Sequence, residues 1–145
     1  MFLENGHFGK TQFLLEKAMD VAITRRKVIA DNIANVNVPH FKRSEVTFEA
    51  QLRRALDSER YVKKNMVPAK MTNERHIPFF RPLDYKKVNG RVHIDYLTSM
   101  RNDGNNVDVE HEMTQAVKNQ LRYQALASKI NSNFKRMNIV LRPSG

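Results

Sequence analysis

The last third of the chain carries apolar and small side chains at the spacing of a helical seam. Their intervals alternate between three and four residues without a break, which is the repeat of a coiled-coil helix. The seam consists of Met113, Ala116, Gln120, Tyr123, Ala127, Ile130, Phe134, Met137 and Leu141. Asp108 is a candidate N-cap, with Glu110 and Glu112 in the first turn, where the helix dipole favours acidic side chains. Residues 108–145 are therefore predicted to form a heptad helix of about 33 residues, near 50 Å long.

A second partial stripe widens the apolar surface of this helix. Val117, Leu121 and Leu126 lie outside the seam, so the apolar surface is broader than one partner helix covers. A helix of this length is also difficult to bury within a chain of 145 residues. We expect the helix to pack both within its own chain and against neighbouring subunits.

The N-terminal segment has its own helical periodicity. Apolar or small side chains recur on one helical face at Leu15, Ala18, Ala22, Ile29, Ile33 and Val36, and Arg25 interrupts the stripe. Residues 1–36 are predicted to form a helix that folds back on the C-terminal one. The fold class is then mainly α, an antiparallel, coiled-coil-like pair of long terminal helices with a loop-rich middle.

The middle of the chain lacks such a period. Residues 37–56 are predicted to be a bend and an arm, and residues 57–107 a basic region of loops and short strands, because prolines stand at 68, 78 and 82. A short β-hairpin is predicted around Asn89–Gly90, since this pair favours a two-residue turn. Its flanking strand residues are Tyr85 on one side and Ile94 and Tyr96 on the other.

The formal net charge is +10, and residues 37–107 contain 14 Lys and Arg against 8 Asp and Glu. Basic pairs such as Lys42–Arg43 and Lys63–Lys64 are scattered among acidic residues rather than gathered into a stripe that would follow a phosphate backbone. A solvated or partner-facing charge is the favoured interpretation. A basic helical protein that binds nucleic acid is the alternative.

Enzymatic patterns are weak. Gly9–Lys10–Thr11 resembles the end of a phosphate loop, but the pattern requires glycine where Glu4 stands. The chain has no cysteine, and the motif H-E-x-x-H is incomplete after His111 because Gln115 replaces its second histidine. A small metal-dependent enzyme built on His111 is a third, disfavoured alternative. We expect no catalysis, no cofactor, no metal and no small-molecule substrate.

The N-terminus MFLENGHFGKTQ lacks a basic stretch followed by an apolar run, and no window approaches the ~20 apolar residues of a membrane span. We therefore expect a soluble chain without a cleaved secretory signal.

The segment DNIANVNVPHFKRSEVTFEAQL, residues 31–52, resembles the N-terminal signature of the bacterial flagellar axial proteins, the rod and hook family. That signature is close to N-N-I-A-N-x-x-T-P-G-[FY]-K-R. The matching residues are Asn32, Ile33, Ala34, Asn35, Asn37, Pro39, Phe41, Lys42 and Arg43. The run DGNNVDVEHEMTQAVKNQLRYQALASKINSNFKRM, residues 103–137, resembles the C-terminal end of the same family, and the short middle is most similar to that of the proximal flagellar basal-body rod proteins.

The resemblance implies a structural subunit of the proximal rod, part of the drive shaft of the bacterial flagellum. It implies polymerisation through the terminal helices, with other copies of the chain, other rod proteins and the membrane-ring components of the basal body as partners. It also implies type III export by the flagellar export apparatus, without a cleaved signal, to a periplasmic rod that serves motility.

Two positions depart from the family pattern. Val38 and His40 stand where threonine and glycine are usual. Because proline fixes its own φ and drives Val38 toward extended geometry, we expect a type I turn at Pro39–His40. The asparagines are expected to hydrogen-bond backbone groups freed where the helix ends, and Phe41 and Phe48 to seat the returning segment on the helices.

Overall fold

The computed structural model describes residues 7–65, 70–76 and 82–141. Its elements are α1 (His7–Ala34), β1 (Ser44–Thr47), α2 (Glu49–Asn65), the 3-10 helix η1 (Tyr85–Lys87), β2 (Arg91–Ile94) and α3 (Val109–Leu141). The chain forms two compact units. One combines residues 1–46 with residues 92–145, and the other consists of residues 47–91. Within the described residues, no helix is long and apolar enough to cross a membrane.

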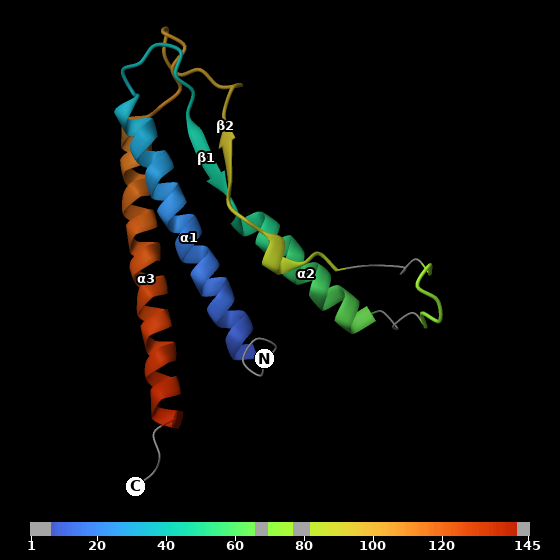
Figure 1. Ribbon diagram of the computed structural model, residues 1–145. Coiled ribbons are helices and arrows are strands. Elements are labelled where there is room, and N and C mark those ends of the chain that lie inside the picture. The colour runs from blue at the N-terminus through green and yellow to red at the C-terminus, as the bar shows by residue number, and fades with distance from the viewer. Residues whose placement is uncertain (1–6, 66–69, 77–81, 142–145) are drawn as a thin grey trace. The chain divides into compact units, whose positions relative to one another are not determined.

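The first unit is built on α1 and α3, which pack side by side and run in opposite directions (Figure 1). The prediction of a mainly helical chain with a long antiparallel pair of terminal helices is confirmed. The N-cap is also confirmed, because Asp108 Oδ1 accepts hydrogen bonds from the backbone N–H of Glu110 at 3.0 Å and of His111 at 3.4 Å.

The core of this unit is small. On α1 the buried apolar side chains are Val21, Ala22, Val28 and Ile29, which recur at helical spacing on one face. Arg25, which interrupts the predicted stripe, lies beside this core and donates from its guanidinium to the backbone oxygen of Val46 at 3.3 Å. The guanidinium of Arg25 thus finds its hydrogen-bond partner on β1, the strand that returns along α1.

The two strands form an antiparallel sheet, β1 with β2 (Figure 1). A short sheet in the middle of the chain is confirmed, but the predicted hairpin around Asn89–Gly90 is wrong, because β2 pairs with β1 rather than with the residues before the turn. Those residues form η1, where Asp84 accepts a hydrogen bond from the backbone of Lys86 at 2.9 Å. This cap favours a helical turn over an extended strand.

The second unit contains α2, which the sequence analysis did not predict. The expectation of loops from residue 57 onward is wrong as far as Asn65. Ala55 is buried on this helix, and its backbone oxygen accepts a hydrogen bond from Ser58 Oγ at 2.9 Å. Ser58 Oγ in turn accepts one from the backbone of Leu83, also at 2.9 Å. Of the prolines used to predict loops, those at 68 and 78 lie outside the described residues.

Candidate assembly site

The end of α1 and the start of α3 are joined by three buried asparagines, Asn32, Asn105 and Asn106, called here the asparagine cluster. Asn105 is completely buried. Its amide nitrogen lies 3.2, 3.1 and 2.9 Å from the backbone oxygens of Asn35, Val36 and Val38. The last carbonyls of a helix have no partner within it, so a side chain from 70 residues further along the chain caps α1.

The other two members hold the start of β1. Asn32 accepts from the backbone N–H of Ser44 at 3.0 Å and donates to its oxygen at 2.8 Å. Asn106 accepts from the backbone N–H of Arg43 at 2.6 Å and donates to the oxygen of Asp95 at 2.9 Å. Each amide thus pairs with backbone groups as a neighbouring strand would. Asn32 and Asn106 together fix the segment that leads into β1.

A buried ion pair adjoins the cluster. Glu112 is 1 % exposed, and its Oε1 lies 2.6 Å from Nε of Arg43 while its Oε2 accepts from Asn32 at 3.1 Å. Burial alone would lower the pKa of Arg43, but the hydrogen bond and charge of Glu112, with a contribution from Glu45, outweigh it and raise that pKa. The pair links α3 to the segment between α1 and β1.

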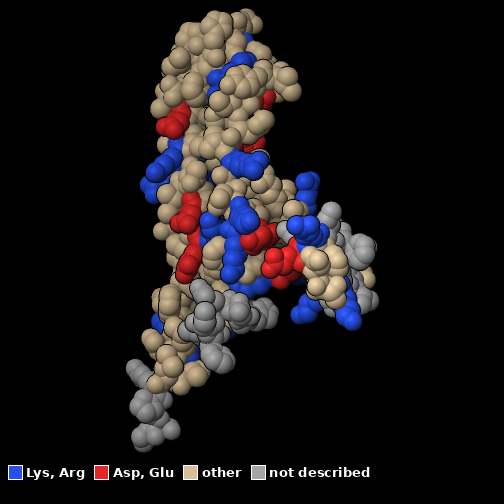
Figure 2. Space-filling view, turned by 45° about the vertical axis from the view of Figure 1, so that its right-hand side comes forward, with Lys and Arg blue, Asp and Glu red and all other residues tan. Residues whose placement is uncertain are grey.

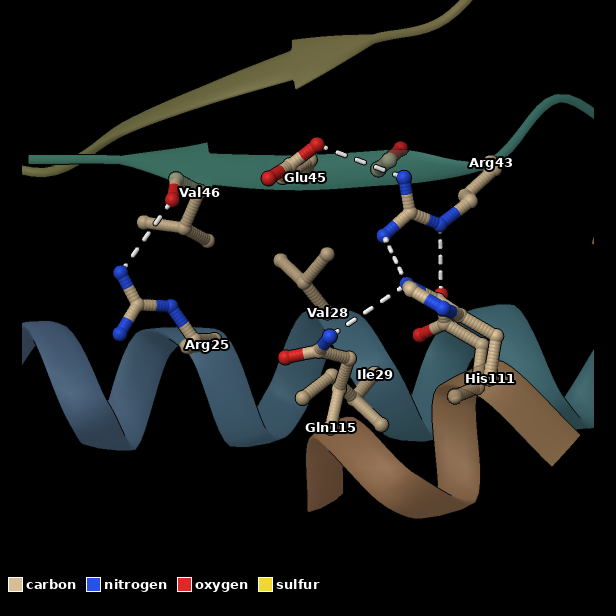
Figure 3. Close-up of a pocket in the computed structure, with 10 residues that line it drawn as sticks. Arg25, Val28, Ile29, Arg43, Glu45, Val46, His111 and Gln115 are labelled. Carbon is tan, nitrogen blue, oxygen red and sulfur yellow. Dashed lines mark hydrogen bonds and ion pairs between the residues drawn. The ribbon is translucent and has the colours of Figure 1, made fainter. Parts of the chain in front are cut away.

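A pocket of about 360 Å³ lies beside this ion pair. Figure 3 shows its lining side chains, with Arg25 at one end and Arg43 and His111 at the other. Nε2 of His111 lies 3.5 Å from Arg43 and 3.4 Å from Gln115. In the described part of the chain, no three His, Asp or Glu side chains lie close enough together to hold a metal ion. The pocket offers ion-pairing and hydrogen-bonding groups rather than a ligand set.

The bend after α1 differs from the predicted type I turn. The N–H of Phe41 bonds to the oxygen of Val38 at 3.3 Å, but His40 has a φ of 60°, which a type I turn excludes and a type II turn requires. The backbone N–H of His40 donates to the oxygen of Asp103 at 3.0 Å. Gly104, with a φ of 78°, packs so closely that a Cβ there would lie 2.9 Å from the His40 ring. The contacts of His40 with Asp103 and Gly104 hold its backbone in the left-handed conformation.

The signature residues divide between the cluster and the surface. Asn32 is buried, Ile33 and Phe41 are half-buried, and Asn35 donates to the oxygen of Asp31 at 2.7 Å. Exposed members are Ala34, Asn37 and Pro39. The structure therefore brings Asn32 and Asn35 to the end of α1, and the backbone N–H of Arg43 joins the cluster through Asn106.

The residues of the predicted seam also divide into half-buried and exposed members. Its half-buried members are Ala116, Tyr123, Ala127, Ile130 and Met137. The inner face of α3, which contacts α1, combines them with the buried polar residues Glu112, Asn119 and Asn133. Asn119 donates to the backbone oxygen of Ala22 at 2.8 Å, yet its buried Oδ1 has no hydrogen-bond partner.

The remaining seam residues, Met113, Gln120, Phe134 and Leu141, are exposed in the single chain. Met113 is 57 %, Phe134 45 % and Leu141 70 % exposed. Val117 and Leu121, of the second stripe, are 61 % and 60 % exposed. These five side chains are called here the exposed face of α3. Met113, Val117 and Leu121 form one row because residues four apart are neighbours on a helix.

Several residues of this site were missed by sequence reasoning. Asn105 and Asn106 were noted only within the run that resembles the family's C-terminal end, and Glu112 only as an acidic residue of the first helical turn. Asn119 and Asn133 were not singled out. Asn119 stands seven residues after Glu112, and Asn133 stands 14 residues after Asn119. That heptad repeat of polar residues was the available signal.

Charge is mixed on the surface. In the view of Figure 2, basic and acidic side chains lie next to one another, with no continuous basic stripe on this face. The distribution on this face agrees with the scattered pattern in the sequence, and this face offers no track for a phosphate backbone.

Comparison with known proteins gives the family. The chain is 41 % identical over 129 residues to the flagellar basal body rod protein FlgB of Borrelia hermsii, covering 89 % of this chain and 93 % of the relative. It is 37 % identical over 135 residues to that of Borreliella burgdorferi, covering 93 % and 98 %. With that of Bacillus subtilis the identity is 35 % over 134 residues, covering 92 % and 95 %.

No family model matches the chain, so the assignment depends on these relatives, whose names give no support to nucleic-acid binding. They align with this chain along nearly their whole length. The resemblance found in the two terminal segments is therefore confirmed. The chain belongs to the family of flagellar basal body rod proteins FlgB.

Proposed function

We propose that the chain is a structural subunit of the proximal part of the flagellar rod, and that it polymerises through the exposed face of α3. The single observation that carries the proposal is this row of large apolar side chains in the unit that α1 and α3 form. Met113, Val117 and Leu121 are each more than half exposed on an ordered helix. Contiguous exposed apolar surface of this kind is typical of protein interfaces.

The difference between the inner and the exposed face of α3 supports the same proposal. α1 occupies the inner face, where buried polar groups stand among the apolar ones. The exposed face is left for other subunits, namely further copies of the chain and other rod proteins. The two faces together give each subunit one contact that forms its fold and one that forms the polymer.

The setting follows from the proposed role. The subunit would pass through the flagellar export apparatus without a cleaved signal and assemble in the periplasm, next to the membrane-ring components of the basal body. The chain would then act as a mechanical part and catalyse no reaction. The domain division proposed with it is an N-terminal helix (1–36), a bend and arm (37–56), a basic region (57–107) and a C-terminal heptad helix (108–145).

The test is to delete the coding sequence from the host and restore it with an epitope tag in the loop around residue 73, an exposed position. Electron microscopy of purified basal bodies should place the tag on the rod, and the deletion strain should lack a rod and motility. A complete rod in the deletion strain would overturn the proposal. So would a tag that is absent from purified basal bodies.

A further inference from the structure

An ordered loop beside the asparagine cluster presents large apolar side chains to solvent. Leu97 is 98 % exposed, Tyr96 70 % and Met100 69 %; these three residues are called here the apolar loop. The loop follows β2 at the end of the helix pair where α1 ends and α3 begins (Figure 1). A fully exposed leucine gains nothing from the fold of its own chain.

The apolar loop is nevertheless held in one conformation. Asp95 accepts hydrogen bonds from the backbone N–H groups of Leu97 at 3.1 Å and Thr98 at 3.2 Å, and from Thr98 Oγ1 at 2.6 Å. Asn106 of the asparagine cluster donates to Thr98 Oγ1 at 2.9 Å, and Lys42 Nζ donates to the backbone oxygen of Thr98 at 2.9 Å. An apolar side chain on a pre-ordered support binds at a lower entropic cost than one on a flexible segment.

The same unit contains a groove that suits such a side chain. It lies between α1 and α3, has a volume of about 410 Å³, and is lined by Ile29, Ala116, Val117 and Leu121 together with polar side chains that include Arg26 and Gln120. Val117 and Leu121 also belong to the exposed face of α3, so the groove is continuous with the surface proposed for assembly. Arg26 complements the carboxylate of Asp95, which stands two residues before Leu97.

One copy cannot join its own loop to its own groove. Val117 and Leu121 lie 8 and 12 residues into α3, about 12 to 18 Å along the helix from its N-terminus, whereas the apolar loop precedes that N-terminus. A contact between two different patches of identical subunits is heterologous, and it repeats from copy to copy to give a ring or a helical filament.

We propose that the apolar loop of one subunit inserts Leu97 into the groove between α1 and α3 of a second copy, so that Ile29, Val117 and Leu121 receive it and Arg26 pairs with Asp95. This inference depends on the proposed function, because it names the patches that join successive copies in the rod. The loop then sets the register between copies, while the exposed face of α3 supplies the remaining contact.

The absence of cysteine from the sequence permits a direct test. The tagged chain carrying Leu97→Cys together with Val117→Cys is produced in the host, and its basal bodies are purified and oxidised mildly. Because a disulfide requires Cα atoms within about 7 Å, a heterologous contact predicts a ladder of covalent dimers, trimers and longer oligomers. The two single variants should give monomers only.

The matched control is Leu97→Cys with Lys118→Cys, since Lys118 is exposed next to Val117 but does not line the groove. This pair should give at least about tenfold less covalent oligomer than the Val117 pair, because a disulfide tolerates little displacement. Monomers alone from the Val117 pair in basal bodies that contain the tagged chain would overturn this inference and leave the proposed function intact. Basal bodies without the tagged chain would instead overturn the proposed function, and this inference with it.

Discussion

The inner and exposed faces of α3 differ in composition. The inner face, against α1, contains a buried glutamate and two buried asparagines, while the exposed face carries Met113, Val117, Leu121, Phe134 and Leu141. A monomer that folded only for itself would place these apolar groups inside. On the proposed function, the exposed apolar groups become buried against neighbouring subunits, while the small apolar core, hydrogen bonds and one ion pair specify the fold of the single chain.

This division has a physical advantage. Buried polar groups give modest net stability, but they penalise wrong pairings, since a misplaced amide or carboxylate loses its partners. Asn32, Asn105 and Asn106 find their partners only when the end of α1 and the start of α3 meet in one register. The exposed apolar face, by contrast, favours association without fixing its register, which is the role proposed for the apolar loop.

The largest expected effect comes from placing a charge on each face in turn. Phe134→Asp should leave the chain folded, because Phe134 is 45 % exposed, but it should abolish rod assembly, since a carboxylate would enter an apolar contact at every copy. Soft-agar motility should be lost while helicity by circular dichroism stays unchanged. Lys135→Asp, the adjacent exposed position, is the control and should retain motility.

Ile130→Asp should lose motility as well, but for a different reason. Ile130 is half-buried on the inner face, so its charge should also lower the helicity and the unfolding midpoint of the purified chain. If Ile130→Asp left the purified chain as stable as the unmodified one, the assignment of the two faces would be wrong.

The next effect concerns the ion pair of the inner face. Glu112→Gln keeps the shape of the side chain but leaves Arg43 without its buried partner, and should lower the free energy of unfolding by about 3 kcal/mol. Urea unfolding followed by circular dichroism measures it. Glu110→Gln, at an exposed position two residues earlier, should change stability by less than about 0.5 kcal/mol. Equal effects of the two substitutions would show that the ion pair is not part of the fold.

A smaller effect is expected in the turn where His40 contacts Gly104. His40→Gly should stabilise the chain by about 0.5 to 1 kcal/mol, because glycine adopts positive φ without steric cost. Gly104→Ala should destabilise it by at least about 1 kcal/mol, since its Cβ would lie 2.9 Å from His40 and its φ of 78° would be strained. Thermal unfolding of the two variants tests the turn, and shifts of the same sign would contradict it.

The smallest effect is a pH dependence in the apolar loop. The hydrogen bond from Thr98 is the main cause that lowers the pKa of Asp95 below its ordinary value of 3.8. A carboxyl with a lowered pKa stabilises the folded form above its unfolded pKa, and this stability is lost as the pH falls through the folded pKa. The amide resonances of Leu97 and Thr98 should therefore be constant from pH 7 to pH 5 and shift at lower pH, with a midpoint below 3.8. In Asp95→Asn this step should be absent.

The terminal helices could be predicted because their signals are local. The periodicity of α3, its N-cap Asp108 and the stripe on α1 are each contained within one segment. The 3-4 spacing identified the seam residues but not their burial, because Tyr123 and Ile130 are half-buried while Met113 and Phe134 are exposed. Which side α1 occupies is decided by polar contacts such as Asn119 to Ala22, across 97 residues.

The asparagine cluster and α2 were not predicted from local sequence patterns. Asn105 and Val36 are 69 residues apart in the sequence, so no window contains both the helix end and the side chain that caps it. For α2 a signal was present, since Leu52, Ala55 and Leu56 recur at helical spacing, but the prolines and charges further along the chain obscured it. Around Asn89–Gly90 the turn signal was overridden by the cap at Asp84.

The central claim is that the exposed face of α3 becomes buried on assembly. Met113→Cys introduces a single thiol at a side chain that is 57 % exposed, and Lys118→Cys introduces one at an exposed position outside that face. Labelling each with a water-soluble maleimide, in the purified chain and in purified basal bodies, measures burial directly. The account predicts rapid labelling of both thiols in the purified chain and loss of labelling at position 113 alone in basal bodies. Equal labelling of position 113 in both preparations would contradict it.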